Sequence, residues 1–180
     1  MKLKDKYKKE LLPRLIEELK LKNKLEAPKM VKVVLNVGFG RCNKDKVFIA
    51  NVVSGLEKIT GQKPILTKAK KSISSFKIRE GMIIGACVTL RKDMMYDFVE
   101  KLIKVTFPRV RDFRGISDKS VDRGGNITIG FKEHIAFPEI SSDEIENLFG
   151  LEISIHTTAK TRKEGLALFE MLEFPFKKDK

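Results

Sequence analysis

The sequence has few cysteines and no tryptophan, and both shortages narrow the kinds of protein it can encode. The two cysteines, Cys42 and Cys87, are too few for a disulfide framework and lack the Cys-x-x-Cys spacing of a structural zinc site. Without tryptophan the chain offers few platforms on which unpaired bases could stack in succession. We therefore expect reduced thiols, no bound metal, and no threading of single-stranded nucleic acid.

Long apolar runs are also missing. No stretch approaches the roughly 18 apolar residues of a membrane-spanning helix. The charged start, Met1 to Lys6, leads into no apolar signal-peptide core. We expect a cytoplasmic protein with no membrane partner.

The sequence does contain a large excess of basic residues. Its 180 residues include 37 Lys and Arg against 24 Asp and Glu, for a net charge of +13. The excess lies early: residues 31–92 hold thirteen basic and three acidic residues, whereas residues 125–180 hold seven and ten. Charges that only kept the chain soluble would be mixed, so this separation favours a nucleic-acid partner over a merely solvated face. The length predicts a single domain, residues 1–180.

Hydrophobic periodicity predicts an α+β fold. The absence of strict β–α alternation and the presence of a hairpin favour one layer of about five antiparallel or mixed strands packed against helices. Strands are expected at 30–38, 63–67, 85–91, 127–131 and 151–155. Helices are expected at 2–24, where Pro13 must bend or split the helix, and at 47–60, with Asn43 or Asp45 as N-cap. Further helices are expected from an Asp93 cap towards Pro108, at 141–150, and from Thr161 to about Phe174. An extended basic hairpin arm is expected at 68–84, and a long irregular loop at 107–125.

Catalytic machinery is not visible in the sequence. The two histidines, His134 and His156, have no motif around them and are interpreted as structural or surface residues. The run Val37 to Gly40 begins like a dinucleotide fingerprint, but Asn43 stands where the third glycine is required. We therefore expect no catalytic residue, no cofactor and no enzyme activity.

Polar side chains on two predicted strands suit contacts with RNA. Lys32 and Asn36 lie opposite the apolar face of the first strand, and Thr89 and Arg91 lie opposite that of the third. If both strands belong to one sheet, an amide, a hydroxyl and a guanidinium would share a face and could serve phosphates, ribose hydroxyls and base edges. Ordinary solvent exposure explains these residues equally well, and the same ambiguity holds for Gln62.

Two further basic segments have competing interpretations. Residues 67–81 carry five basic residues with several hydroxyls, which suits an arm that contacts phosphates better than a disordered loop tip. In residues 108–115 arginines alternate with apolar residues. Ion pairs with Asp112, Asp118 and Asp122 would explain these arginines as well as a second contact surface would.

Several short blocks together resemble bacterial ribosomal protein five of the large subunit, the family that binds 5S ribosomal RNA. The resemblance runs from about Tyr7 to Phe176, and the order and spacing of the blocks make it specific. The blocks are NVG at 36–38, TGQKP at 60–64, TKAKKSI at 67–73, FKIREG at 76–81, TLR at 89–91, PRVRDFRG at 108–115, FPEI at 137–140 and TTAKT at 157–161.

The resemblance implies a non-enzymatic protein of the central protuberance, with neighbouring large-subunit RNA and proteins as further partners. It implies 5S rRNA contacts, peptidyl-site tRNA contacts through the arm, and a bridge to a protein of the small-subunit head. The rRNA-binding residues expected are Lys32, Asn36, Gln62, Lys63, Thr89 and Arg91. Those for tRNA are Lys68, Lys70, Lys71, Ser72, Ser75, Lys77 and Arg79, and those near the bridge are Arg109, Arg111 and Arg114.

Two alternatives stay open. An RNA-modifying enzyme could use the same basic face, although it would need a cofactor loop or a clustered acid and base. A protein-binding scaffold could also carry an incidentally basic surface.

Overall fold

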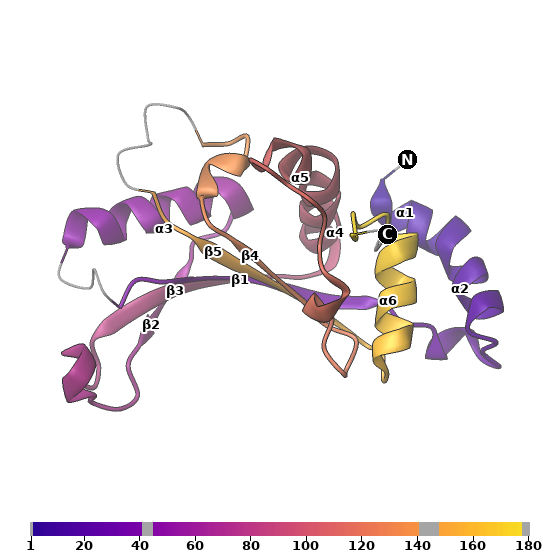
Figure 1. Cartoon of the computed structure of the whole chain (residues 1–180), viewed down its shortest axis with the longest axis horizontal. Coiled ribbons are helices and arrows are strands. Elements are labelled where there is room, and N and C mark those ends of the chain that lie inside the picture. The colour runs from indigo at the N-terminus through magenta and orange to yellow at the C-terminus, as the bar shows by residue number, and fades with distance from the viewer. Residues whose placement is uncertain (1, 41–44, 141–147, 178–180) are drawn as a thin grey trace. The chain divides into compact units, whose positions relative to one another are not determined.

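The computed structural model describes residues 2–40, 45–140 and 148–177, and it confirms the α+β class (Figure 1). The strands form one antiparallel five-stranded sheet in the order β2-β3-β1-β5-β4. They are β1 (Met30–Gly38), β2 (Ile65–Lys68), β3 (Ile83–Leu90), β4 (Ile127–Phe131) and β5 (Leu151–Thr157). The helices are α1 (Leu3–Lys6), α2 (Leu12–Glu18), α3 (Lys46–Thr60), α4 (Lys92–Lys101), α5 (Phe107–Arg109) and α6 (Arg162–Met171).

The chain divides into two compact units. Unit 1 comprises residues 1–33, 90–129 and 154–180, and unit 2 comprises residues 34–89 and 130–153. The single-domain organisation expected over residues 1–180 stays a prediction.

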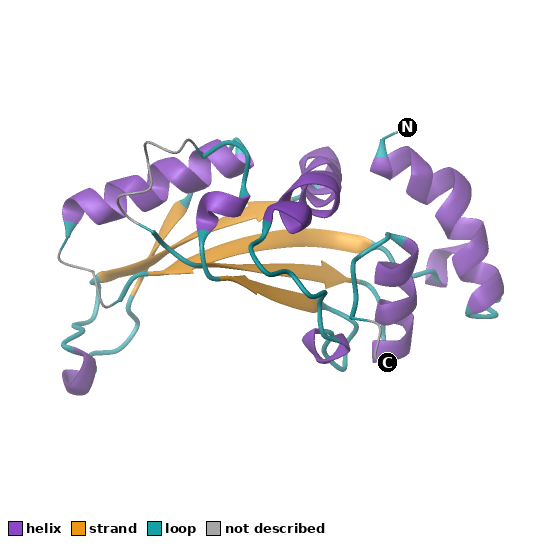
Figure 2. Ribbon diagram, turned by 45° about the horizontal axis from the view of Figure 1, so that its top comes forward, coloured by secondary structure: helices purple, strands orange, loops and turns teal. Residues whose placement is uncertain are grey.

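In unit 2, α3 covers one face of the strands. The side chain of Asp45 accepts hydrogen bonds from Val47 N (2.9 Å) and Phe48 N (3.1 Å), so Asp45 is the N-cap, and Asn43 lies outside the described residues. The helix ends at Gly61, whose φ of 69° is left-handed. Both views show α3 lying along the sheet (Figure 2). The opposite face of the unit 2 strands is therefore free to carry polar side chains.

In unit 1, the N-terminal helix is interrupted just before Pro13. Residues Tyr7–Leu11 form a π-helical turn, closed by Leu12 N donating to the carbonyl of Tyr7. Such a turn accommodates proline, which has no N–H to donate. The α-helix is thus split near Pro13, one of the two predicted effects of this proline, and it ends at Glu18, six residues before the expected Lys24.

The helix after β3 corrects two predictions. Its N-cap is Arg91, which makes no capping bond, while Asp93 lies in the first turn and pairs with Lys4 instead. The helix then continues past the expected end at Pro108, through a π-helical turn (Leu102–Thr106) into α5. Within the stretch expected to be irregular, 107–125, residues Phe107–Arg109 and Asp118–Ser120 are helical turns. The helix tolerates Pro108 because this residue lies in the first turn of α5, where its missing N–H is not needed.

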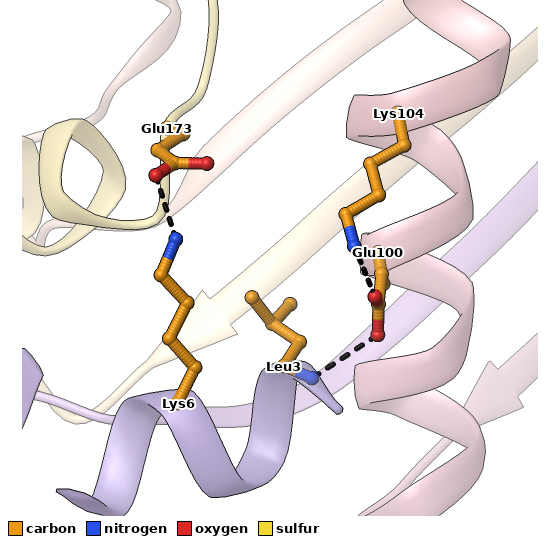
Figure 3. A network of polar contacts seen from close by, with 5 residues as sticks. All are labelled: Leu3, Lys6, Glu100, Lys104 and Glu173. Carbon is orange, nitrogen blue, oxygen red and sulfur yellow. Dashed lines mark hydrogen bonds and ion pairs between the residues drawn. The ribbon is translucent and has the colours of Figure 1, made fainter. Parts of the chain in front are cut away.

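Polar contacts hold the N-terminal helix within unit 1 (Figure 3). Leu3 N donates to Glu100 Oε2 (3.1 Å), and Lys104 Nζ lies 2.5 Å from Glu100 Oε1. Lys6 Nζ lies 2.6 Å from Glu173 Oε1, just beyond the end of α6. These contacts join α1, α4 and the segment after α6, which lie far apart in the sequence.

The beginning of α6 is as predicted and its end is not. Thr161 Oγ1 accepts from Glu164 N (3.3 Å), as expected of an N-cap. Glu164 Oε2 in turn accepts from Lys160 N (2.8 Å), one residue before the Thr161 N–H that a strict capping box would use. The helix ends at Met171, before the expected Phe174. The predicted helix at 141–150 falls largely on residues 141–147, outside the described part of the chain.

Candidate nucleic-acid interface

The uncovered face of unit 2 carries Asn36 and Thr89. Both are exposed and alternate with buried neighbours, Leu35 and Val37 on β1 and Val88 on β3. β1 and β3 are adjacent, and Phe39 N donates to the carbonyl of Ile84 (2.9 Å). Continued antiparallel pairing from this bond makes Asn36 and Thr89 diagonal neighbours on the face opposite α3.

Gln62 and Lys63 follow the turn that ends α3. Thr60 Oγ1 donates to the carbonyl of Leu56 (2.6 Å) and accepts from Gln62 N (3.3 Å). These bonds fix the backbone of Gln62, whose side chain is half-buried, while Lys63 is exposed. Unit 2 therefore contains Asn36, Gln62, Lys63 and Thr89 of the predicted rRNA set.

The other two members of that set belong to unit 1. Arg91 is exposed at the N-cap of α4, and Lys32 is half-buried on β1. Lys32 lies close enough to His156 of β5 to affect its titration. Burial lowers the pKa of His156 below its ordinary value, the charge of Lys32 lowers it further, and Asp122 acts in the opposite direction. His156 is half-buried, so it is only partly the surface residue that was expected.

Unit 1 also contains a pair of neighbouring hydroxyl side chains that was not predicted from the sequence. Thr128 Oγ1 on β4 lies 3.2 Å from Ser154 Oγ on β5. Both side chains alternate with buried residues of their strands, so each orientation could have been predicted. That the two strands are neighbours could not be read from the sequence, so the pairing of these hydroxyls was missed.

Residues 69–82 fold back on themselves between β2 and β3. Ala69 N donates to the carbonyl of Met82 (2.8 Å), and Ile73 and Ile78 exchange backbone hydrogen bonds of 2.9 and 3.1 Å. The turn Ser74–Phe76 closes the far end, drawn as the short magenta helix beyond β2 and β3 (Figure 1). The side chains predicted to contact tRNA are all exposed. These are Lys68, Lys70, Lys71, Ser72, Ser75, Lys77 and Arg79.

The cations of this hairpin are not engaged elsewhere in the described part of the chain. Neither Lys68 at the end of β2 nor any of the four hairpin cations, Lys70, Lys71, Lys77 and Arg79, makes an ion pair or side-chain hydrogen bond with another described residue. By contrast, Ser72 Oγ accepts from Glu80 N (2.9 Å). Lysine and arginine charges without protein partners are free to meet phosphates.

The three arginines predicted near the bridge are exposed in unit 1. Among the described residues, Arg109, Arg111 and Arg114 form no ion pair, so the alternative of a structural ion-pair network is not supported. Asp122 instead accepts from Asn126 N (2.8 Å) and Asn126 Nδ2 (2.9 Å). That these arginines form a second contact surface stays a prediction.

His134, one of the two catalytic candidates considered, is a structural residue. Its ring is buried and stacks on Phe149, with centroids 3.9 Å apart, and its Nδ1 accepts from Phe149 N (3.4 Å). Across the described ranges no group of three or more His, Cys, Asp or Glu could hold a metal ion. Of the helices that the structure describes, none has the length and apolar character needed to cross a membrane.

Comparisons with known proteins agree with the resemblance seen in the sequence. Residues 23–79 match the family described as ribosomal protein L5, and residues 83–176 match the model of the C-terminus of the same ribosomal protein family. The large ribosomal subunit protein uL5 of Desulforapulum autotrophicum is 53% identical over 175 residues, covering 97% of this chain and 98% of that protein. The chain therefore belongs to the ribosomal protein L5 family.

Proposed function

We propose that this chain anchors 5S ribosomal RNA in the large ribosomal subunit, using the polar residues of β1, β3 and the turn after α3. Its family makes it a structural, RNA-binding component of the large subunit that works on the ribosome in the cytoplasm, and not an enzyme. The 5S rRNA, the residues that contact it and the other partners named below are the proposal.

One observation carries this proposal most directly. Asn36 and Thr89 are exposed diagonal neighbours on a strand face that α3 leaves uncovered. An amide and a hydroxyl placed in this way can read ribose hydroxyls and base edges of a folded RNA, whereas free cations such as Lys63 and Arg91 supply affinity for its phosphates.

Two further surfaces of the chain carry exposed cations that suit other partners. The hairpin at 69–82 presents exposed cations and hydroxyls at its surface, which supports contact with peptidyl-site tRNA. The arginines at 109, 111 and 114 are exposed and form no ion pair with described residues, which supports contact with a protein of the small-subunit head or with neighbouring rRNA.

Binding of 5S rRNA by the purified full chain tests the main proposal. Asn36→Ala and Arg91→Ala should each weaken binding by about 1–3 kcal/mol, because each removes a positioned hydrogen-bonding group. Lys70→Ala and Lys71→Ala are matched controls from the hairpin and should leave 5S rRNA binding nearly unchanged. Equal losses in both groups would contradict the division between the two surfaces.

The salt dependence provides a second measurement on the same complexes. Each phosphate neutralised by the chain should contribute about −0.7 to −0.9 to the slope of log affinity against log salt. A flat titration would exclude the basic region 31–92 as the docking surface.

A further inference from the structure

The turn at the tip of the hairpin carries an exposed aromatic ring, Phe76, which has no part in the charge-based contacts proposed above. Phe76 is 68% exposed, and within the described chain its ring makes no aromatic or cation–π contact. A large ring in water is unfavourable for the isolated protein, and exposed aromatic residues commonly mark a contact surface.

The backbone around Phe76 fixes its place at the tip. The turn Ser74–Phe76 is closed by Lys77 N donating to the carbonyl of Ser74 (3.0 Å), and Lys77 has a left-handed φ of 54°. The reciprocal bonds between Ile73 and Ile78 close the loop directly behind it. Because these bonds pre-order the loop, a partner that covers Phe76 has less backbone entropy to remove.

The neighbouring apolar side chains differ from Phe76. Ile73 is also exposed, at 44%, but it is aliphatic and has no flat ring. Ile78 is only half-exposed, and its Cδ1 lies 3.7 Å from the position that a Cβ would take on Gly40, so it packs towards the sheet end of the hairpin. Ser74 and Ser75 are small and exposed, so they leave the ring uncovered. Phe76 is therefore the side chain of the turn that can offer a flat apolar surface to a partner.

The charge around the ring indicates what covers it. Lys70, Lys71, Lys77 and Arg79 are exposed on the same hairpin, and Glu80 is the one acidic residue between positions 62 and 92. A polyanion is the partner that matches this charge. RNA combines that charge with flat apolar surfaces, its bases, which stack on aromatic side chains.

We propose that Phe76 stacks on a nucleobase of the tRNA that the hairpin contacts. The cations then hold the phosphates, while the ring holds a base and contributes binding free energy that salt does not screen. This inference rests on the proposed tRNA contact and adds to it a residue and a type of interaction.

Ribosomes carrying variant chains test the inference, with deacylated tRNA in the peptidyl site as the probe. The dissociation constant is measured at several monovalent salt concentrations and fixed Mg²⁺. Phe76→Ala should raise it about fivefold or more without changing the salt slope, as expected for a lost base–aromatic stack. Lys70→Ala and Lys71→Ala should raise it while lowering the slope.

A second pair of variants separates stacking from apolar burial in general. Phe76→Trp keeps a flat ring and should bind like the original chain, whereas Phe76→Leu keeps apolar area without a ring and should resemble Phe76→Ala. Thermal melting of each purified chain should be unchanged, because Phe76 is exposed.

Each failure has a distinct meaning. If Phe76→Leu binds as well as the original, apolar area alone is enough, the ring does not stack on a base, and the inference is wrong. If Phe76→Ala has no effect while the lysine variants do, the inference is wrong and the tRNA contact stands. If none of these variants changes tRNA binding, the proposed tRNA contact is itself wrong.

Discussion

Two glycines in unit 1, Gly125 and Gly165, allow a direct test of how closely α6 packs against the turn at Gly125. Gly165 lies in the first turn of α6 against the turn at Gly125, and a Cβ on Gly165 would stand 2.4 Å from Gly125 Cα and 2.6 Å from its carbonyl oxygen. Gly125 has a left-handed φ of 74°, and its carbonyl accepts from Thr157 Oγ1 (2.9 Å). Both sides of this contact are backbone, so neither can move as a flexible side chain would.

The cost of Gly165→Ala follows from these distances. Carbon atoms in contact normally stay about 3.5 Å apart, so α6 or the turn would have to shift by about 1 Å. Overpacking of this kind costs about 1–3 kcal/mol or more, and the better helix propensity of alanine offsets up to about 1 kcal/mol. We expect a net loss near 2 kcal/mol, which lowers Tm by about 4–8 °C for a protein of this size.

Thermal unfolding followed by circular dichroism measures the effect on the full chain. Gly130→Ala is the matched control, because nothing lies within 4 Å of a Cβ there and its φ is not left-handed. We expect this control to melt within a degree or two of the original chain. A Gly165→Ala chain that melts at or above the temperature of the original would refute the close contact between α6 and the Gly125 turn.

Two further predictions concern a titration and a helix cap. Lys32→Met should move the pKa of His156 back towards its ordinary value, which an NMR titration of the imidazole measures; an unchanged pKa would mean that the Lys32 charge does not act on this ring. Because folding lowers the pKa of His156, the unfolded chain binds a proton there at a higher pH than the folded chain does. The contribution of His156 to stability is therefore fully present above the unfolded pKa of about 6.5 and is lost as the pH falls below it. This loss should be less steep in Lys32→Met. Asp45→Ala should cost about 1 kcal/mol of unfolding free energy in urea, because Val47 N and Phe48 N lose their acceptor; no loss would contradict the cap.

The elements governed by a simple repeat were predictable from the sequence. β1 has its predicted bounds, Met30–Gly38, because apolar and polar residues alternate along its length and β-branched residues fill it. α3 has one of its two predicted caps, Asp45, and it ends at the predicted Thr60, because both boundaries are set by local backbone chemistry. These signals are contained within a few residues of each element.

The errors arise where distant contacts decide the local structure. Asp93 was expected to cap α4, but it pairs with Lys4, which lies 89 residues away in the sequence. The π-helical turns at Tyr7–Leu11 and Leu102–Thr106 have no pattern that distinguishes them from ordinary helix.

In the candidate site, too, the features set by local sequence patterns were predictable and those set by distant contacts were not. The exposure of Asn36 and Thr89 followed from strand alternation. The stacking of His134 on Phe149 and the hydroxyl pair of Thr128 and Ser154 depend on which segments meet in the fold. Sequence patterns indicate which way a side chain faces, but not what it faces.

Exposure also decides how cleanly each proposed contact can be tested. Asn36 is exposed and makes no side-chain hydrogen bond with any described residue, so Asn36→Ala should change the free energy of unfolding by no more than about 0.5 kcal/mol. Weakened 5S rRNA binding by a chain with unchanged Tm would therefore report the RNA contact itself. Gln62 is half-buried and interacts with the protein, so its replacement changes folding and binding together. Asn36 is thus the more decisive position at which to test the interface.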